Sequence, residues 1–125
     1  MSALQTIRVK DREIQFSSNP DPMWIFDQKT LGFRETNTAA VNKYGYSREE
    51  FLEMTILDIR PPRDVPELLR SAVHPASRHA SRDERWRHLA KDGTVIPVSI
   101  TSYEIVFEGK QCELVLAHDL RGEKK

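Results

Sequence analysis

The stretch that decides the fold is WRHLAKDGTVIPVSIT, residues 86–101. Asp92-Gly93 at its centre is one of the strongest short signals for a tight turn between two antiparallel strands. After the turn, every second residue of one run is β-branched, namely Ile96, Val98 and Ile100. This alternation puts the three side chains on one face of a strand. The sequence therefore predicts a β-hairpin whose arms are residues 84–90 and 94–107.

A second hairpin follows directly. Glu108-Gly109 supplies its turn, and residues 112–118 form the returning strand. The apolar side chains expected on one side of this strand are Cys112, Leu114 and Leu116. The C-terminal half of the chain is thus predicted to be three antiparallel strands joined by two tight turns.

The N-terminal half contains another strand pair and then three short helices. Residues 23–26 are apolar, and residues 33–36 read as their hairpin partner. The resulting order is two strands, three helices and three strands. This order predicts an α+β domain with one five-stranded antiparallel sheet and the helices packed on one of its faces.

Start and stop signals mark the three helices. Asn37 or Thr38 caps the first helix, and Gly45 supplies its left-handed end. Residues 47–50 (Ser-Arg-Glu-Glu) form a capping box for the second helix. In it the side chains of Ser47 and Glu50 can each accept a hydrogen bond from the backbone N–H of the other residue. A third helix starts at Asp64. Its buried face is expected to comprise Val65, Leu68, Leu69, Ala72 and Val73.

Residues 4–16 carry apolar side chains among charged ones, namely Leu4, Ile7, Ile14 and Phe16. We interpret this segment as an amphipathic helix that ends before Pro20 and Pro22. The amphipathic pattern also predicts homodimerisation through residues 4–16.

Composition excludes several function classes. The 125 residues suit one domain, and 38% hydrophobic with 30% charged residues is typical of a folded globular chain. Nineteen basic residues balance nineteen acidic ones, so we expect no electrostatic preference for nucleic acid or an anionic membrane. The single Cys112 cannot form an internal disulfide, and residues 1–10 lack the apolar core of a signal peptide. These features predict a cytoplasmic domain.

Five segments, in order and at the expected spacing, resemble the PAS domain family. They are Asn19–Asp27, Asn37–Ala40 with Tyr44–Phe51, Leu57–Pro61 with Asp64, Trp86–Thr94, and His118–Leu120. The resemblance runs from Phe16 to Arg121 and departs from the family pattern in the last triplet, which ends in Arg121. It implies a flanking helix at residues 1–16, a PAS domain at 17–121 and a linker to a downstream domain at 122–125.

The resemblance implies a sensory module without catalytic activity of its own. Such modules are most often part of bacterial signalling proteins, such as the sensor histidine kinases of two-component systems. There they couple small-molecule binding or partner contact to an output domain. The residues favour no enzyme, because a Gly-rich phosphate loop, a nucleophile elbow and suitably spaced paired carboxylates are missing from the sequence. The alternative function is a ligand-free dimerisation or docking domain.

Neither flavin nor haem is expected as a cofactor. The flavin-binding branch of the family has a reactive cysteine where Ile56 stands here. Its flavin-facing amides would fall on three residues that are neither Asn nor Gln, namely His88, Val98 and Ala117. In haem-binding members the histidine ligand lies near Leu68, whereas the first histidine of this chain is His74. The histidines show no metal-ligand spacing, so no metal site is expected either. An unknown small molecule stays open as the ligand.

Strand alternation and the resemblance together nominate residues that line a cavity between the sheet and the helices. The candidates are Trp24, Phe26, Ala40, Tyr44, Ile56, His88, Val98, Ile100 and Leu116. The apolar candidates either line a ligand cavity or simply fill the core. His88 can donate a hydrogen bond to an acidic ligand and respond to pH, or it can be a core histidine bonded to the backbone.

Overall fold

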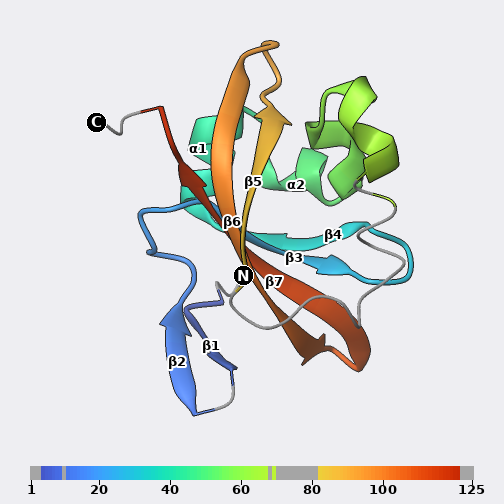
Figure 1. The fold of residues 1–125 in the computed structure, drawn as a ribbon. Helices are drawn as coiled ribbons and strands as arrows, with labels where there is room; N and C mark the ends of the chain where they lie inside the picture. The colour runs from blue at the N-terminus through green and yellow to red at the C-terminus, as the bar shows by residue number, and fades with distance from the viewer. Residues whose placement is uncertain (1–3, 10, 68, 70–81, 122–125) are drawn as a thin grey trace.

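One antiparallel sheet of five strands forms the centre of the computed structural model, which describes residues 4–9, 11–67, 69 and 82–121 (Figure 1). Its strands are β3 (Met23–Asp27), β4 (Phe33–Thr36), β5 (Arg82–Leu89), β6 (Val95–Phe107) and β7 (Lys110–Asp119). They lie side by side in the order β4-β3-β7-β6-β5, and each neighbouring pair is antiparallel. The predicted α+β fold is confirmed.

The two predicted hairpins of the C-terminal half are present. In the first, His88 of β5 lies opposite Ile96 of β6, and Gly93 in the turn has a φ of +92°. In the second, Glu108 and Gly109 have φ angles of 50° and 81°. Two successive positive φ angles are what a type I′ hairpin turn requires. Glycine adopts such angles freely, so the two glycines determine where the chain reverses.

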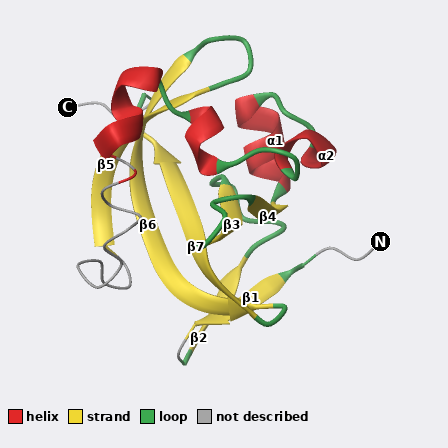
Figure 2. Ribbon diagram, turned by 90° about the vertical axis from the view of Figure 1, so that its right-hand side faces the viewer, coloured by secondary structure: helices red, strands yellow, loops and turns green. Residues whose placement is uncertain are grey.

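Short helices cover one face of the sheet, as Figure 2 shows. They are α1 (Thr38–Tyr44), α2 (Arg48–Phe51) and the two 3₁₀ turns η1 (Ile56–Ile59) and η2 (Pro62–Asp64). The predicted capping box of α2 is confirmed: Glu50 N donates to Ser47 Oγ at 3.0 Å, and Ser47 N donates to Glu50 Oε1 at 2.9 Å. Residues 65–67 and 69 are helical, and the rest of the predicted third helix lies outside the described residues.

Helix α1 is attached to the sheet at both of its ends. At its start, the side chain of Asn37 makes four hydrogen bonds of 2.9–3.0 Å with backbone groups of Phe16, Asp21, Met23 and Ala40. At its end, the backbone oxygen of Tyr44 accepts a hydrogen bond of 2.8 Å from the backbone N–H of Lys91. The helix therefore connects β3 to the turn between β5 and β6.

The predicted N-terminal helix is wrong. In its place, β1 (Thr6–Val9) and β2 (Arg12–Gln15) form a separate two-stranded hairpin, in which Ile7 lies opposite Ile14. The apolar residues form two i, i+2 pairs, Ile7 with Val9 and Ile14 with Phe16. A period of two puts both members of each pair on the same side of a strand, whereas a helix would separate them by about 200° around its axis.

Each face of the sheet carries a hydrophobic cluster. The inner face, which lies beneath the helices, carries a cluster that includes Trp24, Tyr44 and Val98. The outer face carries a second cluster, formed by Met23, Ile25, Cys112 and Leu114 together with apolar residues of the β1–β2 hairpin. Of the helices that the structure describes, none combines the length and the hydrophobicity needed to cross a membrane.

Candidate ligand-binding site

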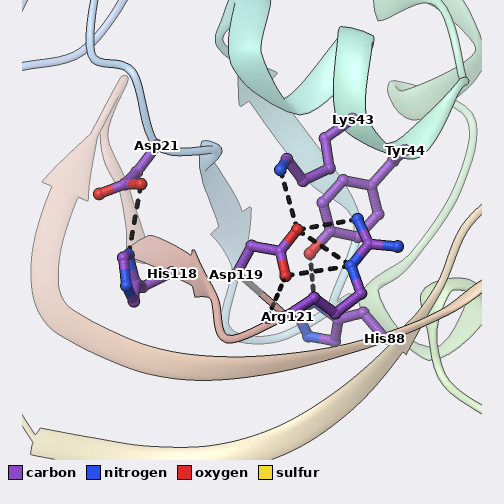
Figure 3. Close-up of polar contacts among 7 residues, drawn as sticks. All are labelled: Asp21, Lys43, Tyr44, His88, His118, Asp119 and Arg121. Atoms are coloured by element: carbon purple, nitrogen blue, oxygen red, sulfur yellow. Dashed lines mark hydrogen bonds and ion pairs between the residues drawn. The ribbon is translucent and has the colours of Figure 1, made fainter. Parts of the chain in front are cut away.

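His88 is a fully buried polar residue among the aromatic side chains of the inner face. Strand β5 places it there, because Trp86 and His88 alternate toward the inner cluster, and Ala90, directly after the strand, also belongs to that cluster. The imidazole centroid lies 5.5 Å from that of Trp24 and 5.6 Å from that of Tyr44. Its Nδ1 is hydrogen-bonded to the Tyr44 hydroxyl at 2.5 Å (Figure 3). His88 is therefore a core histidine, but its partner is a side chain and not the backbone.

The second ring nitrogen of His88, Nε2, has no hydrogen-bond partner among the described residues. Leaving a buried polar atom unpaired costs about 1–3 kcal/mol. Burial, followed by the positive charge of Arg60, holds the pKa of His88 well below its usual range, so its imidazole is neutral at pH 7. Burial also raises the pKa of Tyr44, whose hydroxyl stays protonated.

The position of the imidazole proton follows from counting partners. If the Tyr44 hydroxyl donates to Nδ1, the proton of the neutral imidazole is on Nε2, and that N–H is the one unpaired group. If Nδ1–H donates instead, both the hydroxyl hydrogen of Tyr44 and Nε2 of His88 lack partners within the described part of the chain. The first tautomer leaves fewer buried groups unsatisfied, so Nε2 carries the proton and is a donor.

Arg60 brings a positive charge to the same region. It directly follows η1 and is only 8% exposed. Its guanidinium carbon lies 4.5 Å from the centroid of the Trp86 ring, which is a cation–π contact. After burial, its charge is the next cause of the low pKa of His88, and it partly offsets the rise that burial produces in the pKa of Tyr44. The site therefore combines a neutral hydrogen-bond donor, a nearby cation and aromatic walls.

Eight of the nine predicted cavity residues lie together on the inner face. They are Trp24, Phe26, Ala40, Tyr44, Ile56, His88, Val98 and Ile100. The ninth, Leu116, packs on the outer face, because the inward side chains of this part of β7 are Val115 and Ala117. Arg60 is absent from the predicted set. The one sequence signal for it is a cation that directly follows the apolar residue Ile59.

A second polar cluster lies just outside the inner site, where β7 ends (Figure 3). Lys43 Nζ donates to Asp119 Oδ2 at 2.9 Å, and Arg121 Nη2 donates to the same oxygen at 2.8 Å. The hydrogen bonds from Arg121, and then the one from Lys43, hold the pKa of Asp119 far below its usual range. Lys43 immediately precedes Tyr44 in α1. Of these two consecutive residues, Lys43 therefore contacts the end of β7 and Tyr44 contacts the inner site.

Comparison with known families accounts for this arrangement of sheet, helices and inner site. A family model described as the PAS fold matches residues 10–120. The chain belongs to the PAS family. The match spans all five strands of the PAS sheet, the helices over its inner face and the ion-paired end of β7.

One curated relative of this PAS domain is named a sensor. It is 26% identical over 110 residues to the methyl sulfide methyltransferase-associated sensor of Methanosarcina acetivorans. That match covers 88% of this chain and 11% of the relative, so the chain spans about a ninth of that protein's length.

Among solved structures, the PAS domain of a Desulfitobacterium hafniense protein has a TM-score of 0.74 at 22% identity, with 83% of this chain and 96% of that chain covered. A domain of the sensory box sensor histidine kinase/response regulator from Geobacter sulfurreducens has a TM-score of 0.68 at 19% identity, with 83% and 87% covered. Both likenesses show the shared fold.

In this PAS domain, Ile56 and the thiol of Cys112 lie in different clusters. Ile56 is buried in the inner cluster, whereas Cys112 is fully buried in the outer one, where burial raises the pKa of its thiol. Cys112 is therefore a neutral core residue that does not face the inner site. The expectation of neither flavin nor haem stays a prediction, and His74 lies outside the described residues.

Proposed function

We propose that the chain is the sensory domain of a longer signalling protein, in which it couples small-molecule binding or partner contact to an output domain. The relatives support this role, since one is named a sensor and another is a domain of a sensor histidine kinase/response regulator. On the same likeness we propose a histidine kinase of a two-component system as the output. The domain itself is non-catalytic in this proposal, and it acts in the cytoplasm.

The observation that carries the proposal is the pair of consecutive residues Lys43 and Tyr44 in α1. Tyr44 is 1% exposed and is bonded to His88 on the inner face. Lys43 exposes 33% of its side chain and is ion-paired with Asp119 at the end of β7. A displacement of Tyr44 by a ligand therefore also displaces Lys43 relative to the end of β7.

The ion pairs at the end of β7 are weak enough to be switched. Exposed and partly exposed ion pairs stabilise a protein by about 0.2–1 kcal/mol each. A change of about 1.4 kcal/mol alters an equilibrium tenfold, so straining the Lys43–Asp119 pair changes the population of the paired state several-fold. A small molecule can supply this much free energy through its different affinities for two conformations.

Tyr44→Phe tests the coupling, because it removes the hydroxyl that bonds His88 and keeps the aromatic ring. The backbone N–H of Arg121 donates to Asp119 Oδ1 at 2.8 Å, and we expect its NMR resonance to shift in Tyr44→Phe. The matched control is Tyr103→Phe on the outer face of β6, which should leave this resonance unchanged. An unchanged Arg121 resonance in Tyr44→Phe, or an equal shift in the control, would contradict the coupling.

The alternative function, a ligand-free dimerisation or docking domain, is favoured by the outer face. Tyr103, Ile105, Phe107 and Leu116 are only partly buried there. A cleft of about 500 Å³ opens between β2 and the two long strands β6 and β7. In this alternative a second copy of the chain contacts the outer face and residues 4–16.

Ligand titration with thermal melting separates the two functions. A sensor melts at a higher temperature as the concentration of its ligand rises, whereas a docking domain does not respond to small molecules. Homodimerisation is tested by the mass in solution. Ile105→Asp places a charge on the outer face and should convert a dimer to a monomer. If the dimer mass stays unchanged, the outer face is not the dimer interface.

A further inference from the structure

We propose that the cleft between the β1–β2 hairpin and the outer face of the sheet binds an alkyl carboxylate, with the carboxylate on Arg12 and the hydrocarbon chain on the floor of the cleft. This site is on the opposite face of the sheet from His88, so it goes beyond the proposed sensory function and does not depend on the inner site. It is argued from the volume of the cleft, its apolar floor and the side of β2 on which Arg12 stands.

The cleft lies where two separate sheets meet. The β1–β2 hairpin is a sheet of its own and is not a continuation of the five-stranded one (Figure 1). Residues of β2, β6 and β7 border a cleft of about 500 Å³ between the two sheets. Sites for small organic molecules commonly measure roughly 300–1,000 Å³. The cleft is therefore large enough for such a ligand.

The floor of the cleft is mostly apolar and follows the long strands. It consists of two cross-strand pairs of β6 and β7 and one residue of β3, namely Tyr103 with Leu114, Thr101 with Leu116, and Met23. Neighbouring pairs on one face of a sheet are about 7 Å apart along the strands. Tyr103 and Leu116 are only partly buried, so water contacts part of this floor in the free chain. Covering it with a hydrocarbon chain is favourable, and its direction along the strands suits a linear chain.

Arg12 brings a positive charge to the side of the hairpin that faces this floor. It lies opposite Val9, and Val9 belongs to the outer cluster. Residues directly opposite each other in an antiparallel pair share one side, so Arg12 is on the sheet-facing side too. Glu13 also borders the cleft, but it is on the other side of β2 because successive side chains alternate. The charge that β2 directs toward the floor is therefore positive.

The hydrogen-bonding groups of the cleft match a carboxylate. Within the part of the chain that the structure describes, the guanidinium of Arg12 and the hydroxyl of Tyr103 have no hydrogen-bond partner and Arg12 has no ion pair. Both groups can donate, and the guanidinium fork fits the two oxygens of a carboxylate. A single negative charge balances one guanidinium, whereas the second charge of a phosphate would be left close to Glu13. The head group of the ligand is therefore a carboxylate.

Octanoate is the probe, and its controls are acetate, which lacks the chain, and octanamide, which lacks the charge. Titrations follow the melting temperature and the ¹³C methyl resonances of Ile14 and Leu116 at the cleft, with those of Ile56 and Val98 as reporters of the inner face. We expect octanoate to raise the melting temperature with concentration and to shift the methyls of the cleft and not those of the inner face. Octanamide should bind about tenfold more weakly, because hydrogen bonds to charged groups are among the strong ones. Acetate should give no measurable shift.

Arg12→Gln assigns the charge effect, and its matched control is Arg8→Gln. Both side chains are exposed, so neither substitution disturbs the core. Arg8 lies opposite Glu13, on the side of the hairpin that faces away from the sheet, so the control removes the same charge from the other side. Arg12→Gln should weaken octanoate binding about tenfold and leave octanamide binding unchanged. Arg8→Gln should change octanoate binding less than about twofold.

Four results would overturn the outer site: no response to octanoate, shifts of the inner methyls instead of those of the cleft, equal binding of octanamide, or equal losses in Arg8→Gln and Arg12→Gln. A dimer in which a second copy covers the cleft and prevents octanoate binding would also overturn it, and would favour the docking alternative. Octanoate binding at the cleft with an unchanged Arg121 amide would support this site and leave the sensory function standing, because the two sites are on opposite faces of the sheet.

Discussion

Replacing Asn37 with alanine should destabilise the domain by about 3–5 kcal/mol. Asn37 is 2% exposed, and its four hydrogen bonds hold α1 to β3 and to the chain before it. Loss of the helix cap alone costs about 1 kcal/mol. The backbone N–H of Met23 and the backbone oxygen of Asp21 also lose their partner, and each unsatisfied group costs about 1–2 kcal/mol more. The total is a large fraction of the roughly 5–15 kcal/mol that stabilises an ordinary domain.

Urea unfolding followed by tryptophan fluorescence measures this loss, because Trp24 is buried in the inner cluster. The matched control is Asn42→Ala in the same helix, where the exposed side chain should change the free energy of unfolding by less than about 0.5 kcal/mol. Asn37→Asp keeps the acceptor oxygens, loses the amide donor and should fall between the two. A loss below about 1.5 kcal/mol in Asn37→Ala would refute the reasoning, since water would then replace the side chain at these backbone groups.

A double-mutant cycle with Lys43→Met and Asp119→Asn should give a coupling free energy of about 0.5–1 kcal/mol in urea unfolding, and a value of zero would mean that the pair does not stabilise the fold. The pKa of Asp119 is depressed in the folded state, so its ion pairs stabilise the fold above about pH 4, and this stabilisation is lost as the pH falls further. Between pH 5 and pH 2, the free energy of unfolding should therefore fall more for the unaltered chain than for Asp119→Asn. The pKa of His88 is also depressed, so the unfolded chain takes up this proton first, and stability should fall below about pH 6.5 by at most about 1.4 kcal/mol per pH unit. His88→Phe should remove that part of the pH dependence, and an identical pH profile would contradict a buried neutral imidazole. Gly93→Ala should cost about 1 kcal/mol through its φ of +92° alone, since no atom lies within 4 Å of the added carbon, and an unchanged urea midpoint would show that the turn adapts.

Turns and caps of this domain can be predicted from the sequence because they depend on a few adjacent residues. Asp92-Gly93 sets a turn through the φ angle that glycine adopts, and Ser47 with Glu50 caps a helix through hydrogen bonds three residues apart. Together with strand alternation, these local signals suffice for the order of the elements and for the sheet. Eight of the nine predicted inner residues follow from the same alternation.

Features that depend on distant segments cannot be predicted in this way. The apolar spacing in residues 4–16 suits a helix as well as a strand pair, and the outer face that the hairpin covers comes from β3, β6 and β7. Leu116 is misplaced for a related reason: Leu114, Val115, Leu116 and Ala117 are all apolar, so alternation does not reveal which side meets the helices. Arg60 is buried because η1 brings it over Trp86, and this contact joins two residues that are far apart in the sequence.

Helix α1 has a mechanical consequence for the whole sheet. Its anchors, Asn37 on β3 and Tyr44 on the turn after β5, stand on either side of the central strands β7 and β6. A seven-residue helix has a fixed length, so it acts as a brace between them. A change in the twist of the sheet that moves β3 relative to the turn after β5 therefore strains the hydrogen bonds at the two ends of the helix. A pull exerted on the outer strands would therefore reach Tyr44, and through its hydroxyl the imidazole of His88.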